Sequence, residues 1–184
     1  MNQKIKKLTL VGLMTALCFI GFQFLKIRVP IGGTATAIHL GNTFCILAAL
    51  LLGGVYGGIA GAVGMGIADV LDPTYITSAP ITLILKMIMG LIAGGLYKVL
   101  RKKNMNEFGA SSIASAVALI MNTLLTPIVR SLYNYLIFSK SADILKLYAV
   151  SSLTTSAITS LITLVAVVLL FVPLKTALTK NKLI

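Results

Sequence analysis

APITLILKMIMGLIAGGLY, residues 79–97, is a run of nineteen residues that contains one charged side chain, Lys86. Such a run is long enough to cross the hydrocarbon core of a bilayer, which takes about 20 residues. The rest of the chain has the same character, because 58% of the 184 residues are hydrophobic and 11% are charged. A soluble domain has roughly a quarter of its residues charged. The sequence therefore predicts an integral membrane protein.

Six apolar stretches predict an all-α bundle of six transmembrane helices, which form a single membrane domain over residues 1–184. We expect these helices at residues 8–27, 38–53, 55–72, 79–99, 110–132 and 150–172. The second stretch is short, and only Gly53 and Gly54 separate it from the third. Two helices joined by a tight glycine turn are our interpretation, and a broken re-entrant pair is the alternative.

The amino terminus resembles a signal peptide, because the basic segment MNQKIKK precedes an apolar run and Ala-Thr-Ala follows at residues 35–37. The apolar run is longer than is usual for a signal peptide, and Lys26 and Arg28 come between it and the Ala-Thr-Ala segment. We therefore interpret it as the first transmembrane helix.

The distribution of basic residues predicts the orientation of the bundle. If the amino terminus is cytoplasmic, the cytoplasmic segments carry ten lysines and arginines and the outer segments carry four. This is a clear positive-inside bias, so we expect both termini in the cytoplasm and the protein in the cell membrane of a prokaryote. The basic residues behind the net charge of +12 thus lie mostly at helix ends, and they predict no nucleic-acid partner.

Polar residues gather in the outer half of this predicted bundle. Lys86 lies seven residues below the outer end of its helix, about 10 Å deep, where a charge costs several kcal/mol and usually faces a polar cavity. The alternatives are snorkelling for Lys86, interfacial anchoring for Arg130 and Tyr133, and hydrogen bonds within the helices for Ser and Thr. We predict an outward pocket for a small polar solute. Its candidate lining residues are His39, Asn42, Asp72, Tyr75, Lys86, Asn122, Thr126, Arg130, Tyr133, Thr155 and Thr159.

Small residues follow one face of two helices and suggest close helix contacts. Gly57 and Gly61 are four residues apart in the third helix, and Gly12 and Ala16 have the same spacing in the first. Such rows let helix backbones approach closely, either inside the bundle or against a membrane partner. We predict a partner-docking surface at these four residues, with internal packing as the alternative.

Several kinds of chemistry have no counterpart in the sequence. It contains no G-x-x-x-x-G-K-[ST] loop, no cluster of metal-ligand spacing and no nucleophile–base pair within one segment. Cys18 and Cys45 lie inside apolar helices, where we expect packing roles. We therefore predict neither an enzyme nor a bound cofactor or metal, and a solute pocket without an energy source needs a partner.

IHLGNTFCILAALLLGGVYGGIAGAVGMGIADVLDPTYITSAPITLILKMIMGLIAGGLYK, residues 38–98, resembles the substrate-binding S components of energy-coupling factor (ECF) vitamin transporters. The matching elements are H-L-G at the start of the second helix, A-A-x-L-L-G-x-x-Y-G, an A-D end of the third helix and A-P-x-T-L-I-x-K in the fourth. The likeness is greatest to the group around riboflavin, pyridoxine and hydroxymethylpyrimidine uptake. Asn42 stands where this group often has Asp, so this position carries an amide without a charge.

The resemblance implies a subunit that captures a vitamin from outside, with the loop between the first two helices as a lid. It also implies docking through Gly12 and Ala16 on a membrane T component that bears two ATPases. Lys86 would be the polar floor of the pocket, either bonding the ligand or holding Asp69 or Asp72 in place. The hydroxyl and amide lining favours pyridoxine or hydroxymethylpyrimidine, with Tyr75 or Tyr133 to stack on the ring. A riboflavin-specific subunit, a structural or regulatory membrane protein and an enzyme acting on lipid are the alternatives.

Overall fold

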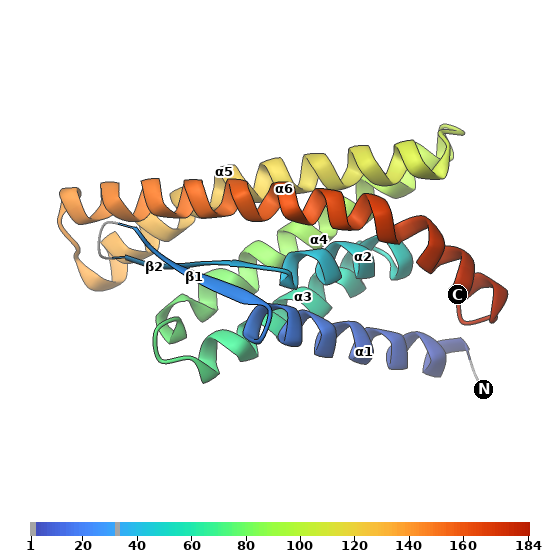
Figure 1. Ribbon diagram of the computed structural model, residues 1–184, viewed down its shortest axis with the longest axis horizontal. Helices are drawn as coiled ribbons and strands as arrows, with labels where there is room; N and C mark the ends of the chain where they lie inside the picture. The colour runs from blue at the N-terminus through green and yellow to red at the C-terminus, as the bar shows by residue number, and fades with distance from the viewer. Residues whose placement is uncertain (1–2, 32–33) are drawn as a thin grey trace.

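The computed structural model describes residues 3–31 and 34–184, which form six α helices and one β hairpin. Both ends of the chain lie at the same end of the bundle, and the hairpin lies toward the other end (Figure 1). The elements are α1 (Gln3–Gln23), β1 (Lys26–Ile31), β2 (Thr34–His39), α2 (Gly41–Leu52), α3 (Gly54–Leu71), the 3₁₀ turn η1 (Ile76–Ser78), α4 (Ala79–Lys102), α5 (Glu107–Phe138) and α6 (Ala142–Lys180).

Five helices in the described part of the chain are long and apolar enough to cross a membrane, namely α1, α3, α4 together with η1, α5 and α6. The remaining helix, α2, has 12 residues and is about 18 Å long, which is less than the thickness of a hydrocarbon core. Gly53 separates α2 from α3 with a φ of 104°, a conformation that favours glycine. The predicted tight turn between two helices is therefore present.

The outer surface of α6 shows how the bundle meets lipid. Leu161, Val165 and Leu169, at spacings of four, are exposed, whereas Thr159 and Thr163 are buried against the other helices. In water such a row of exposed large apolar side chains is an aggregation hazard, but in a bilayer it faces acyl chains. Over this stretch of α6 the threonines thus face the other helices and the large apolar side chains face outward, as in a protein solvated by lipid.

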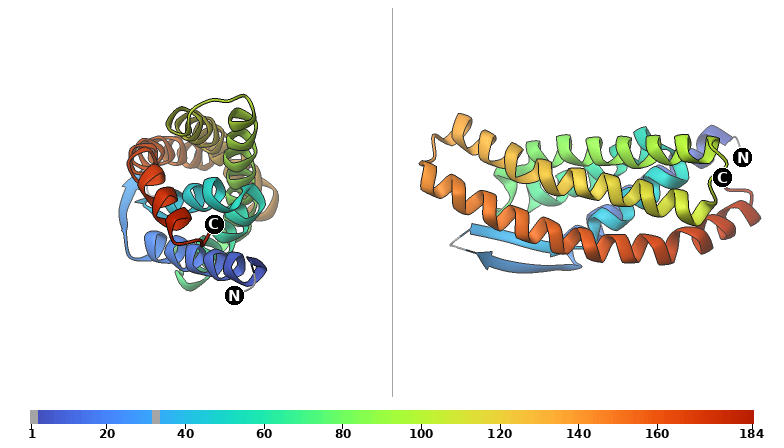
Figure 2. Two further views of the ribbon diagram at one scale, coloured as in Figure 1. Left: turned by 90° about the vertical axis from the view of Figure 1, so that its right-hand side faces the viewer. Right: turned by 90° about the horizontal axis from the view of Figure 1, so that it is seen from above.

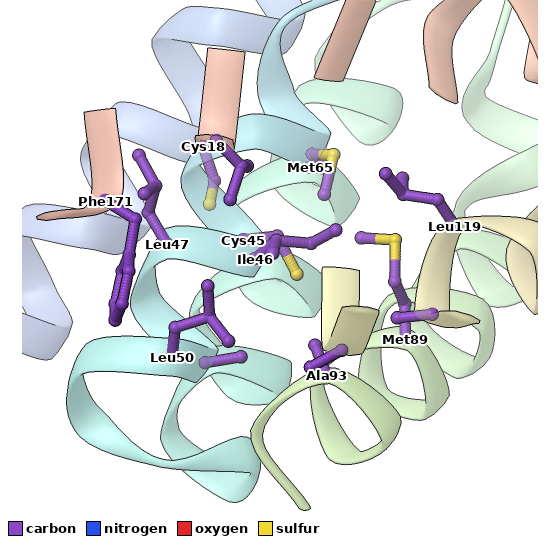
Figure 3. Packing of buried hydrophobic residues seen from close by; sticks show 14 of the residues in the cluster. Cys18, Cys45, Ile46, Leu47, Leu50, Met65, Met89, Ala93, Leu119 and Phe171 are labelled. Atoms are coloured by element: carbon purple, nitrogen blue, oxygen red, sulfur yellow. The ribbon is translucent and has the colours of Figure 1, made fainter. Parts of the chain in front are cut away.

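The apolar core is built around α2, where Cys45, Ile46, Leu47 and Leu50 lie among side chains of the neighbouring helices (Figure 3). Cys45 and Ile46 are fully buried there beside Met65 and Met89, and Phe171 closes the cluster from α6. Cys18 and Cys45 are both free and buried. The two cysteines therefore pack as small apolar residues, as their positions in the sequence predicted.

Glycines let α3 lie against its neighbours with almost no space between the backbones. A Cβ on Gly57 would lie 2.2 Å from the Cα of Ala49 in α2, and a Cβ on Gly61 would lie 2.2 Å from the Sγ of Cys45. On the other side, a Cβ on Gly94 of α4 would lie 2.3 Å from the backbone nitrogen of Gly54. Any side chain at these positions would push the helices apart, so the glycines of α3 hold the bundle together.

The hairpin between α1 and α2 is a feature that we did not predict from the sequence. β1 and β2 are antiparallel, with Lys26 paired to His39 and Val29 to Thr36, and β2 packs beside α6 (Figure 2). Ile and Val alternate with other residues along β1, which is a strand pattern, and a two-glycine connection is typical of hairpins. The two glycines, Gly32 and Gly33, lie outside the described residues.

The helices α5 and α6 extend well beyond the apolar segments that predicted them. α5 continues to Phe138 rather than ending at residue 132, and α6 covers Ala142–Lys180 rather than residues 150–172. Pro173 lies inside α6 and does not end it. Hydropathy marks the part of a helix that is in lipid, but the backbone hydrogen bonds of a helix continue into water. The two helices are therefore joined by a much shorter connection than we expected.

Candidate ligand-binding site

A cavity of about 100 Å³ lies between β2 and the helices α2, α4, α5 and α6. Polar and apolar side chains from widely separated parts of the chain meet on its walls. The lining residues are Phe22, Thr36, Ala37, His39, Asn42, Asp69, Tyr75, Ser78, Ile81, Thr82, Leu85, Lys86, Asn122, Thr126, Arg130, Ser152, Thr155, Ser156 and Thr159. The predicted lining residues other than Asp72 and Tyr133 are all among them.

Within the described part of the chain, five polar atoms on the cavity walls are buried and make no hydrogen bond to another described residue. They are the Nδ1 atom of His39, the Oδ1 atom of Asn42 and the hydroxyl oxygens of Tyr75, Ser152 and Thr159. A buried polar group without a partner costs about 1–3 kcal/mol. Their meeting at one cavity indicates a site that a polar molecule completes by supplying the missing donors and acceptors.

Lys86 projects from the middle of α4 and forms part of the cavity wall. Its side chain is buried, with 8% of its surface exposed, and its Nζ donates a hydrogen bond to the Oδ1 of Asn122 at 3.2 Å. Among the described residues no carboxylate lies within ion-pair distance of this ammonium. A buried cation with one neutral partner keeps donor capacity for a ligand. The snorkelling alternative does not fit this burial.

Asp69 is the acidic group of the cavity, and our candidate list did not include it. It lies near the end of α3, is 1% exposed and accepts a hydrogen bond from the Thr82 hydroxyl of α4. Among the described residues Lys86 forms no ion pair with Asp69 or Asp72, and its other expected role, a bond to the ligand, stays a prediction. The sequence did carry a signal, since a carboxylate at the end of an apolar helix is costly unless it has a role.

Asp72 lies outside the cavity lining and connects two loops. Its Oδ2 accepts hydrogen bonds from the Nζ of Lys26 at 2.7 Å and from the Nη2 of Arg28 at 2.8 Å, and its Oδ1 accepts one from the Thr74 backbone N–H. The bond from Lys26 is the largest cause that lowers the pKa of Asp72 from 3.8 to about 2. Asp72 thus ties β1 to the connection between α3 and α4, and its role as a ligand contact stays a prediction.

Tyr133 does not line this cavity either, and its role as a stacking partner stays a prediction. Its ring packs edge-on against Phe138 within α5, with centroids 5.9 Å apart. Tyr75 does line the cavity, beside Phe22 and with ring centroids 6.2 Å apart. The ring of Phe22 lies 4.5 Å from that of His39. The aromatic wall is therefore made by Phe22, His39 and Tyr75, of which sequence reasoning missed Phe22.

The other lining residues that we missed come from three places, of which the first is η1 and the start of α4, with Ser78, Ile81, Thr82 and Leu85. Thr36 and Ala37 are in β2, and without a predicted hairpin there was no reason to bring them to the site. Ser152 and Ser156 form the row next to Thr155 and Thr159 on α6, and we did not include that row. Spacing along a helix predicts which residues share a face, but it does not predict which of two adjacent polar rows borders a cavity.

Residues 2–180 of this chain match the family described as "ECF-type riboflavin transporter, S component". The chain belongs to this family. S components are multi-pass proteins of the cell membrane that bind the substrate of an ECF transporter and work with its T component and ATPase subunits. They are transport subunits and not enzymes. Membership of the family thus confirms the predicted all-α membrane fold and the location in the cell membrane.

A curated protein of Pyrococcus woesei, described as "Uncharacterized protein in gap 3'region", is similar to part of this S component. The two sequences are 36% identical over 72 residues, which cover 39% of this chain and 47% of the other protein. The chain thus spans about half the length of this relative, whose description names no activity.

The four small residues predicted for docking lie in two different environments in this S component. Gly12 and Ala16 are exposed on α1, and a Cβ on Gly12 would have no atom within 4 Å. Gly57 and Gly61 are buried against α2. The latter pair is occupied by internal packing, so Gly57 and Gly61 are excluded from any docking surface. The exposed pair on α1 remains a prediction.

Proposed function

We propose that this S component captures a small neutral heteroaromatic vitamin or vitamin precursor from outside the cell, of the pyridoxine or hydroxymethylpyrimidine type. The observation that carries the proposal is the group of five unpartnered polar atoms on one small cavity. Amide, imidazole and hydroxyl groups match the hydroxyls and ring nitrogens of such a molecule, and Tyr75 and Phe22 offer faces for its ring.

The charges on the cavity walls argue against a cationic ligand. Lys86 and Arg130 line the cavity, and Asp69, which already accepts a bond from Thr82, is the one acidic group that faces them. A ligand with a permanent positive charge would meet two cations and one engaged carboxylate. A neutral molecule, or one with partial negative charge on its ring substituents, suits this wall better.

Delivery of the ligand is the second part of the proposal. We expect α1 to dock through Gly12 and Ala16 on a T component that bears two ATPases, because this exposed small-residue face lets two backbones approach. The hairpin, which supplies Thr36, Ala37 and His39 to one wall, would act as the lid. Opening it would give the cavity access to the outside.

Riboflavin is a second candidate, favoured by the description of the family to which the chain belongs. The two candidates differ in size and in colour. A cavity of about 100 Å³ suits a single ring better than a three-ring flavin, which would need the hairpin to move outward. A flavin-loaded protein absorbs visible light, whereas pyridoxine and hydroxymethylpyrimidine leave it colourless.

The identity of the ligand is tested on protein purified in mild detergent. We expect mass spectrometry of the released small molecules to find a colourless single-ring compound, and calorimetry with pyridoxine and hydroxymethylpyrimidine to give binding. Calorimetry is the suitable method because the chain has no Trp to report binding by fluorescence. A yellow preparation that binds riboflavin more tightly than either compound would overturn the single-ring proposal.

A matched pair of substitutions tests the site itself. Thr159 and Thr163 lie one turn apart on α6, and both are buried with an unpartnered hydroxyl, but only Thr159 lines the cavity. Thr159→Val should weaken binding about tenfold, which corresponds to one lost hydrogen bond, and Thr163→Val should leave binding unchanged. Equal effects of the two substitutions would remove this cavity from the proposal.

A further inference from the structure

A second, wider hollow lies at the end of the bundle that carries both chain ends. It is a groove of about 810 Å³ between the end of α2, the start of α3 and the last turns of α4, with single contributions from α1 and α6. It shares no lining residue with the ligand cavity. Its walls are Lys7, Ala49, Leu50, Leu51, Leu52, Gly53, Gly54, Val55, Tyr56, Leu91, Gly94, Gly95, Tyr97, Lys98, Arg101, Lys102 and Lys175.

The rim of this groove is strongly basic. Arg101 and Lys102 come three and four residues after Lys98 at the end of α4, so both lie near Lys98 on the helix surface. Lys7 of α1 and Lys175 of α6 add one charge each. None of the lining residues is acidic. The rim therefore has five cations from three helices directed to one groove.

One carboxylate near the rim neutralises only part of this charge. Glu107, at the start of α5, forms ion pairs with Lys175 and, at 3.6 Å, with Arg101. Lys98 and Lys102 have no carboxylate partner among the described residues and are exposed. The groove thus keeps an uncompensated positive charge that fits an anion.

The floor of the groove is apolar and continues onto the surface that faces lipid. Leu50, Leu51 and Leu52 form part of it, and Val55 and Leu91 are exposed at its side. Gly95 leaves a gap in the wall, because a Cβ there would have no atom within 4 Å. Cations above an apolar floor, at the ends of membrane helices, match the order of headgroup and acyl chain in a phospholipid.

We propose that this groove binds an anionic phospholipid of the cytoplasmic leaflet. The phosphate is held by Lys98 and Lys102, with Lys7 across the groove, and an acyl chain follows the apolar side at Val55 and Leu91. The assignment to the cytoplasmic leaflet rests on the excess of lysine and arginine at this end of the bundle. A lipid is favoured over a soluble anion because a soluble anion leaves the apolar floor uncovered.

The proposal is tested by the thermal stability of the purified protein in mild detergent. A thiol-reactive fluorophore reports unfolding, because Cys18 and Cys45 are both buried in the folded protein. We expect phosphatidylglycerol to raise the melting temperature by several degrees and phosphatidylcholine with the same acyl chains to raise it much less. Glycerol phosphate, which has the anionic group without acyl chains, should have no effect.

Substitutions locate the effect. The double variant Lys98→Gln/Lys102→Gln should lose the difference between the two lipids, whereas Lys103→Gln, which removes a charge from the same helix end but not from the groove, should keep it. A Cβ at Gly95 would have no atom within 4 Å, so we expect Gly95→Leu to extend into the groove, to remove the lipid effect and to leave the melting temperature in detergent unchanged.

Four results would overturn the proposal. They are equal stabilisation by the two lipids, full stabilisation by glycerol phosphate, a lipid difference that survives in the double variant, and one that is lost in Lys103→Gln. In a fifth result, the double variant fails to assemble with a T component but keeps its response to phosphatidylglycerol. The groove would then be a protein-binding site, and the lipid proposal would be wrong.

Discussion

Replacement of Asp72 by asparagine would release the hairpin from the connection between α3 and α4. In the structure the Asp72 carboxylate accepts hydrogen bonds from Lys26 at 2.7 Å and from Arg28 at 2.8 Å. Asparagine keeps the shape of the side chain and an oxygen for the Thr74 backbone N–H, which Asp72 binds at 3.1 Å. It removes the negative charge that both cations of β1 face. The substitution therefore weakens the closed position of the hairpin without changing its sequence.

The size of the effect follows from the burial of the three groups. The side chain of Lys26 is 8% exposed and that of Asp72 is 3% exposed, so their hydrogen bond is worth about 1.5–3 kcal/mol. Arg28 is 58% exposed, and its ion pair contributes about 0–1 kcal/mol. The lowering of the Asp72 pKa from 3.8 to about 2 corresponds to about 2 kcal/mol as well. We therefore expect Asp72→Asn to destabilise the closed hairpin by about 2 kcal/mol.

The assay is the rate at which bound ligand leaves the purified protein after dilution into excess competitor. About 2 kcal/mol raises the population of an open hairpin roughly 30-fold. If opening limits release, the dissociation rate rises by up to that factor. Lys26→Gln should have a similar effect, and Arg28→Gln, on the exposed partner, should have less than about a fivefold effect. An unchanged dissociation rate in Asp72→Asn, or an equal effect of Arg28→Gln, would refute this reasoning.

The remaining predictions concern the cavity, the helix surfaces and pH. Lys86→Met should lower ligand affinity about 10- to 100-fold in calorimetry without lowering the melting temperature, because it removes a buried donor and keeps the volume; unchanged affinity would exclude Lys86 from the site. Gly12→Leu, at an open position on α1, should abolish uptake by cells and leave ligand binding by the isolated subunit intact, and loss of both would refute docking there. Gly57→Leu should prevent folding, since its Cβ would lie 2.2 Å from Ala49, and recovery of a monodisperse, ligand-binding protein would contradict the packing. The pKa of Asp72 is lower in the folded protein than in the unfolded chain. Its charge therefore contributes fully to stability at pH values above the pKa of the unfolded chain, and this contribution is lost as pH falls through about 2. The difference in melting temperature between wild type and Asp72→Asn should thus be constant above pH 5 and shrink below pH 4, and a difference that grows below pH 4 would contradict this assignment.

The sequence predicted those features that depend on whether a segment lies in lipid or in water. The apolar stretches predicted six helices in lipid. Charges and unpaired backbone groups are energetically unfavourable in a bilayer, so the segments that cross it are apolar and helical. The same argument brought Lys86 to attention, and the structure has it buried on the cavity wall beside Asn122. The row of Thr155 and Thr159 on α6 follows from helical spacing alone.

Hydropathy did not show where the helices end or how the loops fold. α5 and α6 continue beyond their apolar segments, since a helix is held by its own backbone hydrogen bonds and not by the membrane. The hairpin was missed because its alternating pattern is short and lies between two strong helix signals. Its absence from the predicted fold also removed Thr36 and Ala37 from the predicted site.

The sequence by itself determined that this chain is a six-helix membrane protein with a polar outer half, because transfer between water and lipid acts on each residue separately. Only the tertiary structure decided which polar residues share a cavity and which of them hold the fold. Asp69 and Asp72 are three residues apart, yet one lines the cavity and the other binds Lys26 and Arg28 of the hairpin. Gly12 and Gly57 belong to similar small-residue rows, yet one is open and the other is filled by α2. Such differences depend on which element lies opposite each residue, and that partner is distant in the sequence.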